Sequence, residues 1–182
     1  DIAAWCALRG MTVTLQDRAV EYIQPAMDRA VRLFDKKTYN DDDRKAATER
    51  LRADVNGDGI SDADLIIEAI FEDAGAKQAL YQDMQARMKP DAIIATNTSS
   101  IPLEELRTVL DHPQRFIGLH FFNPVAQLPL VELIRCSDTD EAVLDIGFAF
   151  IKAIGKYGLE CSSAPGFVVN RVLAPYMAEA MH

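Results

Sequence analysis

Short apolar runs alternate with longer amphipathic stretches along this chain. The short runs have the length of strands, and several are apolar at nearly every position, as in strands covered on both faces of a sheet. They lie at 11–16, 64–70, 92–96, 115–119, 130–134 and 156–160. The stretches with helical periodicity lie at 1–9, 18–37, 41–53, 75–88, 103–110, 139–154 and 168–182. Strands that alternate with helices predict an α/β fold with a doubly wound, mostly parallel sheet.

Local signals set several of these boundaries. Gly10 stands where the first helix is expected to end. Pro25 is expected to kink or restart the long helix that contains it, because proline lacks the amide hydrogen that a helix interior needs. Asp138 or Thr139 is expected to cap the helix that runs to about residue 154.

Size and charge narrow the class of protein. The chain has 182 residues, of which 49% are hydrophobic and 26% are charged, as in an ordinary globular protein. Its formal net charge of −9 argues against nucleic acid and anionic membranes as partners. No run reaches the roughly 18 apolar residues of a membrane-spanning helix.

The cysteines point to a reducing environment. Cys6, Cys136 and Cys161 are odd in number and show no C-x-x-C spacing, so neither a disulfide framework nor a metal site is expected. Buried free thiols in a reducing compartment are the simplest interpretation, and we expect a cytoplasmic protein.

The candidate chemistry lies where the predicted strands end. In doubly wound sheets, ligands bind at the carboxyl ends of the strands, and Asp17, 68–72, 97–100 and 120–123 fall there. A histidine side chain ordinarily titrates near neutral pH, and a buried carboxylate can orient its ring and stabilise its charged form. His120 with Glu132 on the next apolar run is therefore a candidate for proton transfer.

Each of these signals also has a structural interpretation. A single histidine at a strand end is usually structural, but Ser99, His120, Asn123 and Glu132 together favour catalysis. Asp17 could bind the ribose of a dinucleotide or cap the next helix, and the sequence favours neither.

A group of cations ends the long helix at 18–37. Lys36 and Lys37, one turn after Arg32, form a cationic patch on an acidic protein. They could be a phosphate site or the ordinary solvated end of a helix, which favours cations.

Longer motifs support a family resemblance. Asn-Thr-Ser-Ser-Ile-Pro at 97–102, Phe-Ile-Gly-Leu-His-Phe-Phe-Asn-Pro-Val at 116–125, Pro-Leu-Val-Glu at 129–132 and Pro-Gly-Phe-Val-Val-Asn-Arg at 165–171 resemble the 3-hydroxyacyl-CoA dehydrogenases. The resemblance covers nearly the whole chain. The Pro-Leu-Val-Glu form, and Ile-Pro-Leu at 101–103, are more similar to the multifunctional fatty-acid oxidation enzymes than to the single-activity ones.

The resemblance implies a Rossmann-like fold and the oxidation of L-3-hydroxyacyl-CoA to 3-ketoacyl-CoA with NAD, in fatty-acid β-oxidation. It makes His120 the general base and gives Glu132 the task of orienting it. Ser99 would hydrogen-bond the reacting oxygen, and Asn170 would help to polarise it. Lys37 falls where the family binds the CoA phosphates. The residues expected along the NAD groove are Asp17, Ala69, Glu72, Lys77, Asn97, Ser99 and Asn123.

Two parts of the family pattern lie outside this sequence. The first is the strand with the G-x-G-x-x-G loop that holds the pyrophosphate, so NAD affinity of this polypeptide is expected to be poor. The strands that flank this first strand in the family would here pair with each other, with a second copy of the chain, or with a further N-terminal segment. The second is most of a C-terminal helical domain, of which 165–182 would be the first helix after an NAD-binding domain at 1–164.

Because these two parts lie outside the sequence, we expect this polypeptide to self-associate and to be inactive by itself. The last helix would expose an apolar face, and that face or the strand slot could join two copies. The face comprises Val168, Val169, Val172, Leu173, Tyr176, Met177 and Met181. Two rival functions stay open: a dehydrogenase of a free 3-hydroxy acid, and a non-catalytic relative that kept the fold as a scaffold.

Overall fold

The computed structural model describes residues 1–180 and contains two β-sheets. The larger has the order β3-β4-β5-β6-β7, and its neighbours run parallel except for the antiparallel pair β5–β6. Its strands are β3 (Leu65–Glu68), β4 (Ile93–Thr96), β5 (Phe116–Phe121), β6 (Leu130–Arg135) and β7 (Tyr157–Ser162). The smaller sheet is the parallel pair β1 (Val13–Gln16) and β2 (Leu51–Asp54). The predicted α/β fold with a mostly parallel sheet is confirmed.

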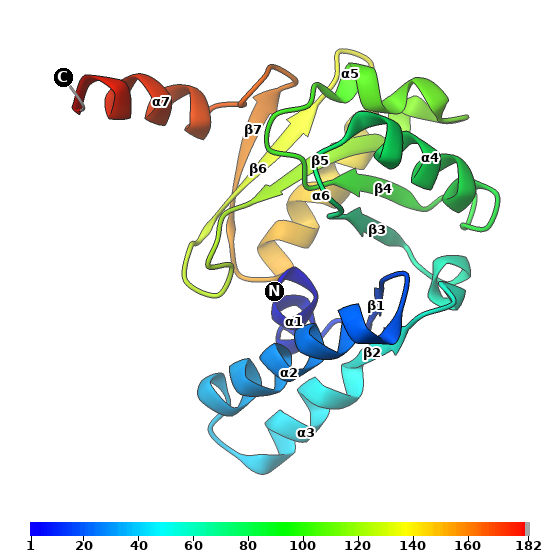
Figure 1. Cartoon of the computed structure of the whole chain (residues 1–182), viewed down its shortest axis with the longest axis vertical. Helices are drawn as coiled ribbons and strands as arrows, with labels where there is room; N and C mark the ends of the chain where they lie inside the picture. Colours follow the sequence, from blue (N-terminus) through cyan, green and yellow to red (C-terminus); the bar gives the residue numbers. More distant parts are fainter. Residues whose placement is uncertain (181–182) are drawn as a thin grey trace.

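Helices connect most of these strands (Figure 1). They are α1 (Ile2–Leu8), α2 (Val20–Lys37), α3 (Asp41–Arg50), α4 (Ala74–Gln85), α5 (Leu103–Leu106), α6 (Glu141–Ala153) and α7 (Val169–Ala180). Helices α2 and α3 lie side by side next to the small sheet, and α7 extends away from the end of β7. The two predicted helix residues 181 and 182, including Met181 of the proposed apolar face, lie outside the described residues.

The sequence analysis was wrong about one strand. It extended the helix that begins at Asp41 to about residue 53, but α3 ends at Arg50 and β2 begins at once. Leu51 is buried and pairs with Val13 of β1. The segment Leu-Arg-Ala-Asp has one large apolar side chain and two charges, so tertiary pairing with β1 decides its conformation against a weak local preference.

Two smaller predictions also need correction. Pro25 does not restart α2, which runs unbroken from Val20 to Lys37. The residue before α6 is Asp140, not Asp138 or Thr139. Thr139 instead uses its hydroxyl to accept a hydrogen bond from the Cys136 amide at 2.9 Å.

No ladder joins β1 to β3 within residues 1–180, so each is an edge strand of its own sheet. The sequence suggested that the neighbours of the family's G-x-G-x-x-G strand could pair directly with each other. The described residues show no such pairing of β1 with β3. Strand β3 is correspondingly less covered than β4: three of its four residues are only half-buried, whereas all of β4 is buried.

Helices cover both faces of the larger sheet. Alternate residues of its strands point to opposite sides, so each face packs into its own apolar cluster. On one face Ile93 and Ile117 belong to a cluster with Trp5 of α1 and Ile151 of α6. On the other face, a second cluster contains Ile94, Phe116 and Ile134 together with residues of α4 and α5. This double cover explains why the strands read as nearly continuous apolar runs.

Substitution of Gly118 in β5 tests the closeness of this packing. A Cβ at Gly118 would lie 2.8 Å from Cβ and Cδ1 of Ile134 on β6. We expect Gly118→Ala to lower the free energy of unfolding by about 1–3 kcal/mol, the usual cost of overpacking a core. The measurement is urea unfolding.

Gly75→Ala is the matched control. The nearest atom to a Cβ there is an Asp73 carboxylate oxygen at 3.5 Å, an ordinary contact, and Gly75 lies in helix α4. We expect a gain of about 0.5 kcal/mol, because alanine is the better helix former. Equal effects of the two substitutions would contradict the packing described for β5 and β6.

Candidate active site

The antiparallel pairing of β5 with β6 places His120 directly opposite Glu132. Their side chains meet, with Nδ1 of His120 2.7 Å from Oε2 of Glu132. The Glu132 side chain is fully buried, and His120 is 6% exposed. A carboxylate only accepts hydrogen bonds, so Nδ1 carries the hydrogen and Nε2 of the neutral ring is the free acceptor. The two residues predicted to act together are therefore in contact.

The second oxygen of Glu132 faces the start of α7. Oε1 accepts the backbone amides of Val168 and Val169, at 2.9 and 2.8 Å. The turn before them contains Gly166 and Phe167, both with positive φ, at 76° and 47°. Such a conformation costs a non-glycine residue energy, and the burial of the Phe167 ring helps to offset it. One buried carboxylate thus ties His120 to the C-terminal helix.

Aromatic rings surround the imidazole. The ring of Phe122 lies 4.6 Å from that of His120, centroid to centroid, and the ring of Phe167 lies 5.6 Å away. Both planes are tilted by 59° relative to the imidazole. These contacts restrict the ring to one orientation and keep water from most of its surface, as a positioned base requires.

The loop after β4 brings Ser99 and Asn170 together. The Asn170 side-chain amide donates to the Ser99 carbonyl oxygen at 3.3 Å, which joins α7 to the loop. Ser99 itself is exposed, and its hydroxyl donates to Oε1 of Glu72 at 3.3 Å, a long hydrogen bond that it would exchange for one to a ligand. Asn97, at the start of the same loop, uses its side-chain oxygen to accept the Phe121 amide at 2.9 Å. Three predicted site residues therefore connect β4, β5 and α7.

Glu72 holds the serine loop from the other side. Its Oε1 accepts the Thr98 hydroxyl at 2.6 Å and the amides of Ser99 and Ser100 at 2.9 and 3.0 Å. Burial alone would raise the pKa of Glu72, but the hydrogen bonds from Thr98, Ser99 and Ser100, with the charge of Lys77, lower it from 4.5 to about 2. Glu72 is therefore a fixed anion at neutral pH.

Lys77 is placed differently from the prediction. The sequence analysis expected it to line the cofactor groove, but its side chain is 1% exposed and lies beneath Glu72. Its ammonium group is 2.7 Å from Oε1 of Glu68 and 3.6 Å from Oε2 of Glu72. A buried ammonium needs such partners, because burial of an unpaired charge is costly.

Glu68 lies in the range 68–72 that was expected at the carboxyl end of a strand, but it was not predicted as a site residue. It ends β3 and its side chain is fully buried. Besides Lys77 it accepts the Ile70 amide and the hydroxyls of Tyr81 and Thr96, at 2.7, 2.7 and 2.8 Å. The available signal was an acid inside a strand that is otherwise apolar, because an acid in such a place has to be paired.

The remaining residues predicted to bind the cofactor lie at exposed positions. Asp17 follows β1, Ala69 follows β3, and Asn123 follows β5. Beside Ala69, Ile70 and Phe71 are 38% and 70% exposed, an uncommon placement for large apolar side chains at the end of a strand. An acid for ribose hydroxyls and an apolar surface for a flat ring fit a dinucleotide at this edge of the sheet.

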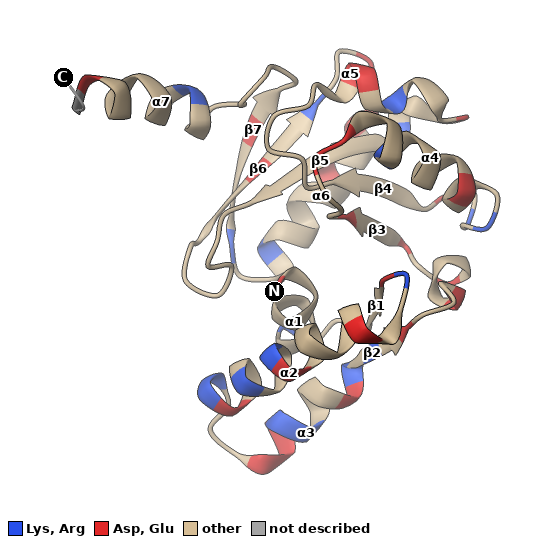
Figure 2. Ribbon diagram, viewed as in Figure 1, with Lys and Arg blue, Asp and Glu red and all other residues tan. Residues whose placement is uncertain are grey.

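Lys37 is exposed at the end of α2, with Lys36 beside it (Figure 2). Helix α2 has 18 residues and is therefore roughly 27 Å long at about 1.5 Å per residue; Lys37 ends it, whereas Asp17 precedes its other end. The hollow next to Lys37 is also lined by Arg9, Arg50 and Trp5. The predicted cationic patch is thus separate from Asp17 and is extended by two arginines.

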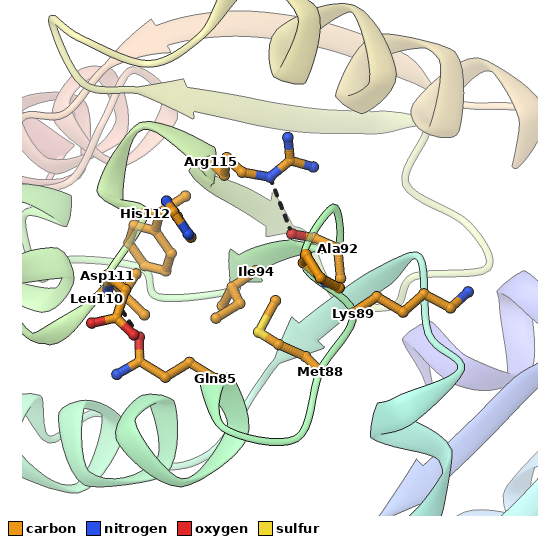
Figure 3. A pocket seen from close by; sticks show the side chains of 11 residues that line it. Gln85, Met88, Lys89, Ala92, Ile94, Leu110, Asp111, His112 and Arg115 are labelled. Atoms are coloured by element: carbon orange, nitrogen blue, oxygen red, sulfur yellow. Dashed lines mark hydrogen bonds between the residues drawn. The ribbon is translucent and has the colours of Figure 1, made fainter.

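A second hollow lies at the amino ends of β4 and β5 (Figure 3). Its lining combines apolar side chains, including Ile94, Phe116 and Met88, with polar ones such as His112 and Arg115. The Arg115 Nε donates to the Ala92 carbonyl oxygen at 3.4 Å. Because ligands of doubly wound sheets bind at the opposite, carboxyl ends, this hollow is not part of the candidate active site.

The fold and the site together define a dinucleotide-binding domain of the Rossmann type. Residues 1–164 match the family described as 3-hydroxyacyl-CoA dehydrogenase, NAD binding domain. The chain belongs to this family, and the resemblance inferred from the motifs at 97–102 and 116–125 is confirmed. NAD is accordingly the cofactor of the domain.

The chain is similar to known proteins of different lengths, and it covers a different share of each. A 3-hydroxybutyryl-CoA dehydrogenase of Bradyrhizobium diazoefficiens is 36% identical over 185 residues, which are 100% of this chain and 63% of that protein. A fatty acid oxidation complex subunit alpha of Vibrio campbellii is also 36% identical, over 93% of this chain and 25% of that protein. The chain is therefore equally identical to a dehydrogenase named for one activity and to a subunit of a fatty acid oxidation complex.

A solved structure agrees with the fold described above. The crystal structure of FadB2 from M. tuberculosis superimposes with a TM-score of 0.93 at 36% identity, over 99% of this chain and 65% of that chain. The chain therefore spans about two thirds or less of these relatives. Among residues 1–180, no helix is both long and apolar enough to cross a bilayer.

The lowered pKa of Glu72 gives a prediction about acid stability. Its carboxylate is better stabilised in the folded state, so its contribution to stability is complete above pH 4.5 and is lost as the pH falls towards 2. We expect Glu72→Gln to be less stable than the wild type at pH 6 and to show a shallower loss of stability between pH 4.5 and 2. Urea unfolding at a series of pH values measures both.

Glu179→Gln, which changes an exposed carboxylate of α7, is the control. It is expected to leave the acid dependence unchanged. Parallel pH curves for Glu72→Gln and the wild type would contradict the hydrogen bonds described for Glu72.

Proposed function

We propose that this protein oxidises L-3-hydroxyacyl-CoA to 3-ketoacyl-CoA with NAD, as its family membership suggests. The observation that carries the proposal is the buried contact of His120 with Glu132, 2.7 Å long, beside the exposed Ser99 loop. It supplies a base whose free nitrogen, Nε2, can take the proton of a 3-hydroxyl group. NAD, when bound, accepts the hydride that leaves C3.

Glu132 has two tasks in this proposal. It fixes Nδ1 as the hydrogen-bond donor, and it stabilises the imidazolium once Nε2 has taken the proton. Because Glu132 also accepts two amides of α7, it does not need to change its position when His120 becomes charged. Positioned proton transfer of this kind contributes about 10²–10⁴ in rate.

The other polar groups orient the substrate and the cofactor. Ser99 would donate its hydroxyl to the reacting oxygen, and Asn170, bonded to the same loop, would help to polarise it. Asp17 would bind the ribose of NAD. Asn97, Glu72, Asn123 and the backbone at Ala69 would line the groove, and Lys77 would contribute by fixing Glu72. Holding C3 in one orientation is expected to contribute more to the rate than the base.

The substrate proposal includes the CoA group. Lys37 would contact its phosphates, and Arg9 and Arg50 in the adjoining hollow strengthen the local positive charge on an acidic protein. In the relatives named above, one name specifies a 3-hydroxybutyryl-CoA dehydrogenase and the other a subunit of a fatty acid oxidation complex. Acyl-CoA and a multienzyme complex are the partners these names suggest for this chain.

Organisation and location complete the proposal. Residues 1–164 form the cofactor domain, and 165–182 would begin a helical C-terminal domain. Val172, Tyr176 and Met177 of α7 are 67%, 74% and 53% exposed, which supports self-association through this helix. A reducing, cytoplasmic compartment is supported by the three free, buried cysteines.

The role of His120 is tested by His120→Gln, which keeps a hydrogen-bonding side chain but removes the base. In a version extended to the length of its relatives, we expect kcat for acetoacetyl-CoA reduction by NADH to fall by about 10²–10⁴, measured from NADH absorbance. His112→Gln is the matched control, because His112 lies at the other end of the sheet and is expected to leave kcat unchanged.

If the extended wild type is folded and binds NADH but has no activity, the scaffold alternative is favoured. If His120→Gln retains full activity, the proposed base is wrong.

The CoA site is tested by Lys37→Glu. A reversed charge is expected to raise KM for an acyl-CoA about tenfold and to leave KM for a free 3-hydroxy acid or a pantetheine thioester unchanged. Lys36→Glu makes the same charge change one residue earlier and is expected to have a smaller effect. Equal effects on both substrates, or full activity on the free acid alone, would favour the free-acid dehydrogenase.

A further inference from the structure

A buried chain of polar side chains begins behind the serine loop. Tyr81 on α4 donates its hydroxyl to Oε2 of Glu68 at 2.7 Å, and the Thr96 hydroxyl donates to the same oxygen at 2.8 Å. The other oxygen of Glu68 binds the Lys77 ammonium group at 2.7 Å. Tyr81, Thr96 and Glu68 are 0%, 0% and 3% exposed. None of the three touches the surface on which a ligand would lie.

The chain continues to the surface through one ammonium group. Lys77 lies between two carboxylates, at 2.7 Å from Glu68 and 3.6 Å from Glu72. Glu72 uses its other oxygen to accept the hydroxyls of Thr98, Ser99 and Ser100 and the amides of Ser99 and Ser100. The position of the Ser99 loop is therefore set by Glu72, that of Glu72 by Lys77, and that of Lys77 by Glu68.

The arrangement has a specific electrostatic consequence. Glu68 and Glu72 share the ammonium group of Lys77. Because Glu68 is the nearer of the two, it limits how closely Lys77 can approach Glu72. Four hydrogen-bond donors hold Glu68 in place: Lys77, Tyr81, Thr96 and the Ile70 amide. If Glu68 lost its charge or a donor, Lys77 would approach Glu72 and pull this carboxylate away from residues 98–100.

We propose that Glu68 and Tyr81 are positioning residues for Ser99, acting through Lys77 and Glu72. Neither would contact the substrate or NAD. That the positioned Ser99 serves catalysis rests on the proposed function, whereas the order of the loop depends only on the contacts above.

Amide hydrogen exchange tests the proposal without any ligand. The amides of Ser99 and Ser100 donate to Glu72, whereas those of Val168 and Val169 donate to Glu132 and serve as an internal reference. We expect Tyr81→Phe to raise exchange at Ser99 and Ser100 about threefold or more, since loss of one hydrogen bond weakens its network by roughly that factor. Exchange at Val168 and Val169 is expected to stay as in the wild type.

Glu68→Gln is the stronger variant, and a larger increase at the same two amides is expected. Glu68→Gln removes one of the two carboxylates beside Lys77, which can prevent folding. If this variant does not fold, the result for Tyr81→Phe tests the proposal. Gln78→Ala is the matched control on α4: it removes hydrogen bonds to the Glu105 carbonyl oxygen and the Thr108 hydroxyl. It should not change exchange at Ser99 and Ser100 relative to the reference.

Two results would overturn the proposal. Unchanged exchange at Ser99 and Ser100 in Tyr81→Phe would show that the buried hydroxyl does not hold the loop. Equal acceleration at all four amides would show a general loosening of the fold.

A double-mutant cycle separates this proposal from the proposed function. If Tyr81 acts through Ser99, Tyr81→Phe should lower kcat in the wild type but have little further effect in Ser99→Ala. Effects that multiply would contradict positioning. If the wild type extended to the length of its relatives has no activity, the proposed function fails, and the exchange experiment still decides whether Glu68 and Tyr81 order the loop.

Discussion

The candidate active site depends on the register of two antiparallel strands. If β6 shifted by one residue against β5, Glu132 would point to the other face of the sheet and His120 would lose its partner. The register is protected by Gly118, which lets Ile134 pack closely against β5, and by apolar neighbours that are buried on both faces. A single antiparallel pair within a parallel sheet thus places an acid from one strand beside a base from the next.

Glu132 and Glu68 are both buried carboxylates, and different sets of hydrogen-bond donors compensate each for its loss of water. Glu132 is bound to an imidazole, to two backbone amides and more weakly to the Cys161 thiol, and within residues 1–180 it has no lysine or arginine partner. Glu68 is bound to an ammonium group, two hydroxyls and one amide. The first arrangement leaves a charge that can stabilise a protonated ring, whereas the second is neutralised and suited to holding a loop.

The sequence revealed the parts of this site that follow from local patterns. The strand that carries His120 is a continuous apolar run, and Glu132 is the only charge inside the next one, so their meeting could be expected. Strand β2 was missed because Leu51–Asp54 has no apolar run and forms only against β1. The burial of Lys77 was also missed, since a lysine on a helix is normally exposed, and only the three-dimensional position of Glu68 and Glu72 accounts for it.

The contact between Glu132 and α7 depends on a conformation that no periodicity predicts. The chain reverses at Gly166 and Phe167 in left-handed backbone conformations, and this turn aims the amides of Val168 and Val169 at the carboxylate. A glycine at 166 adopts positive φ at little cost, whereas for Phe167 the burial of its ring beside His120 helps to offset the cost. The ring that restricts the imidazole therefore also fixes the turn that directs α7 to its acid, so the base, the acid and the helix form one packed unit.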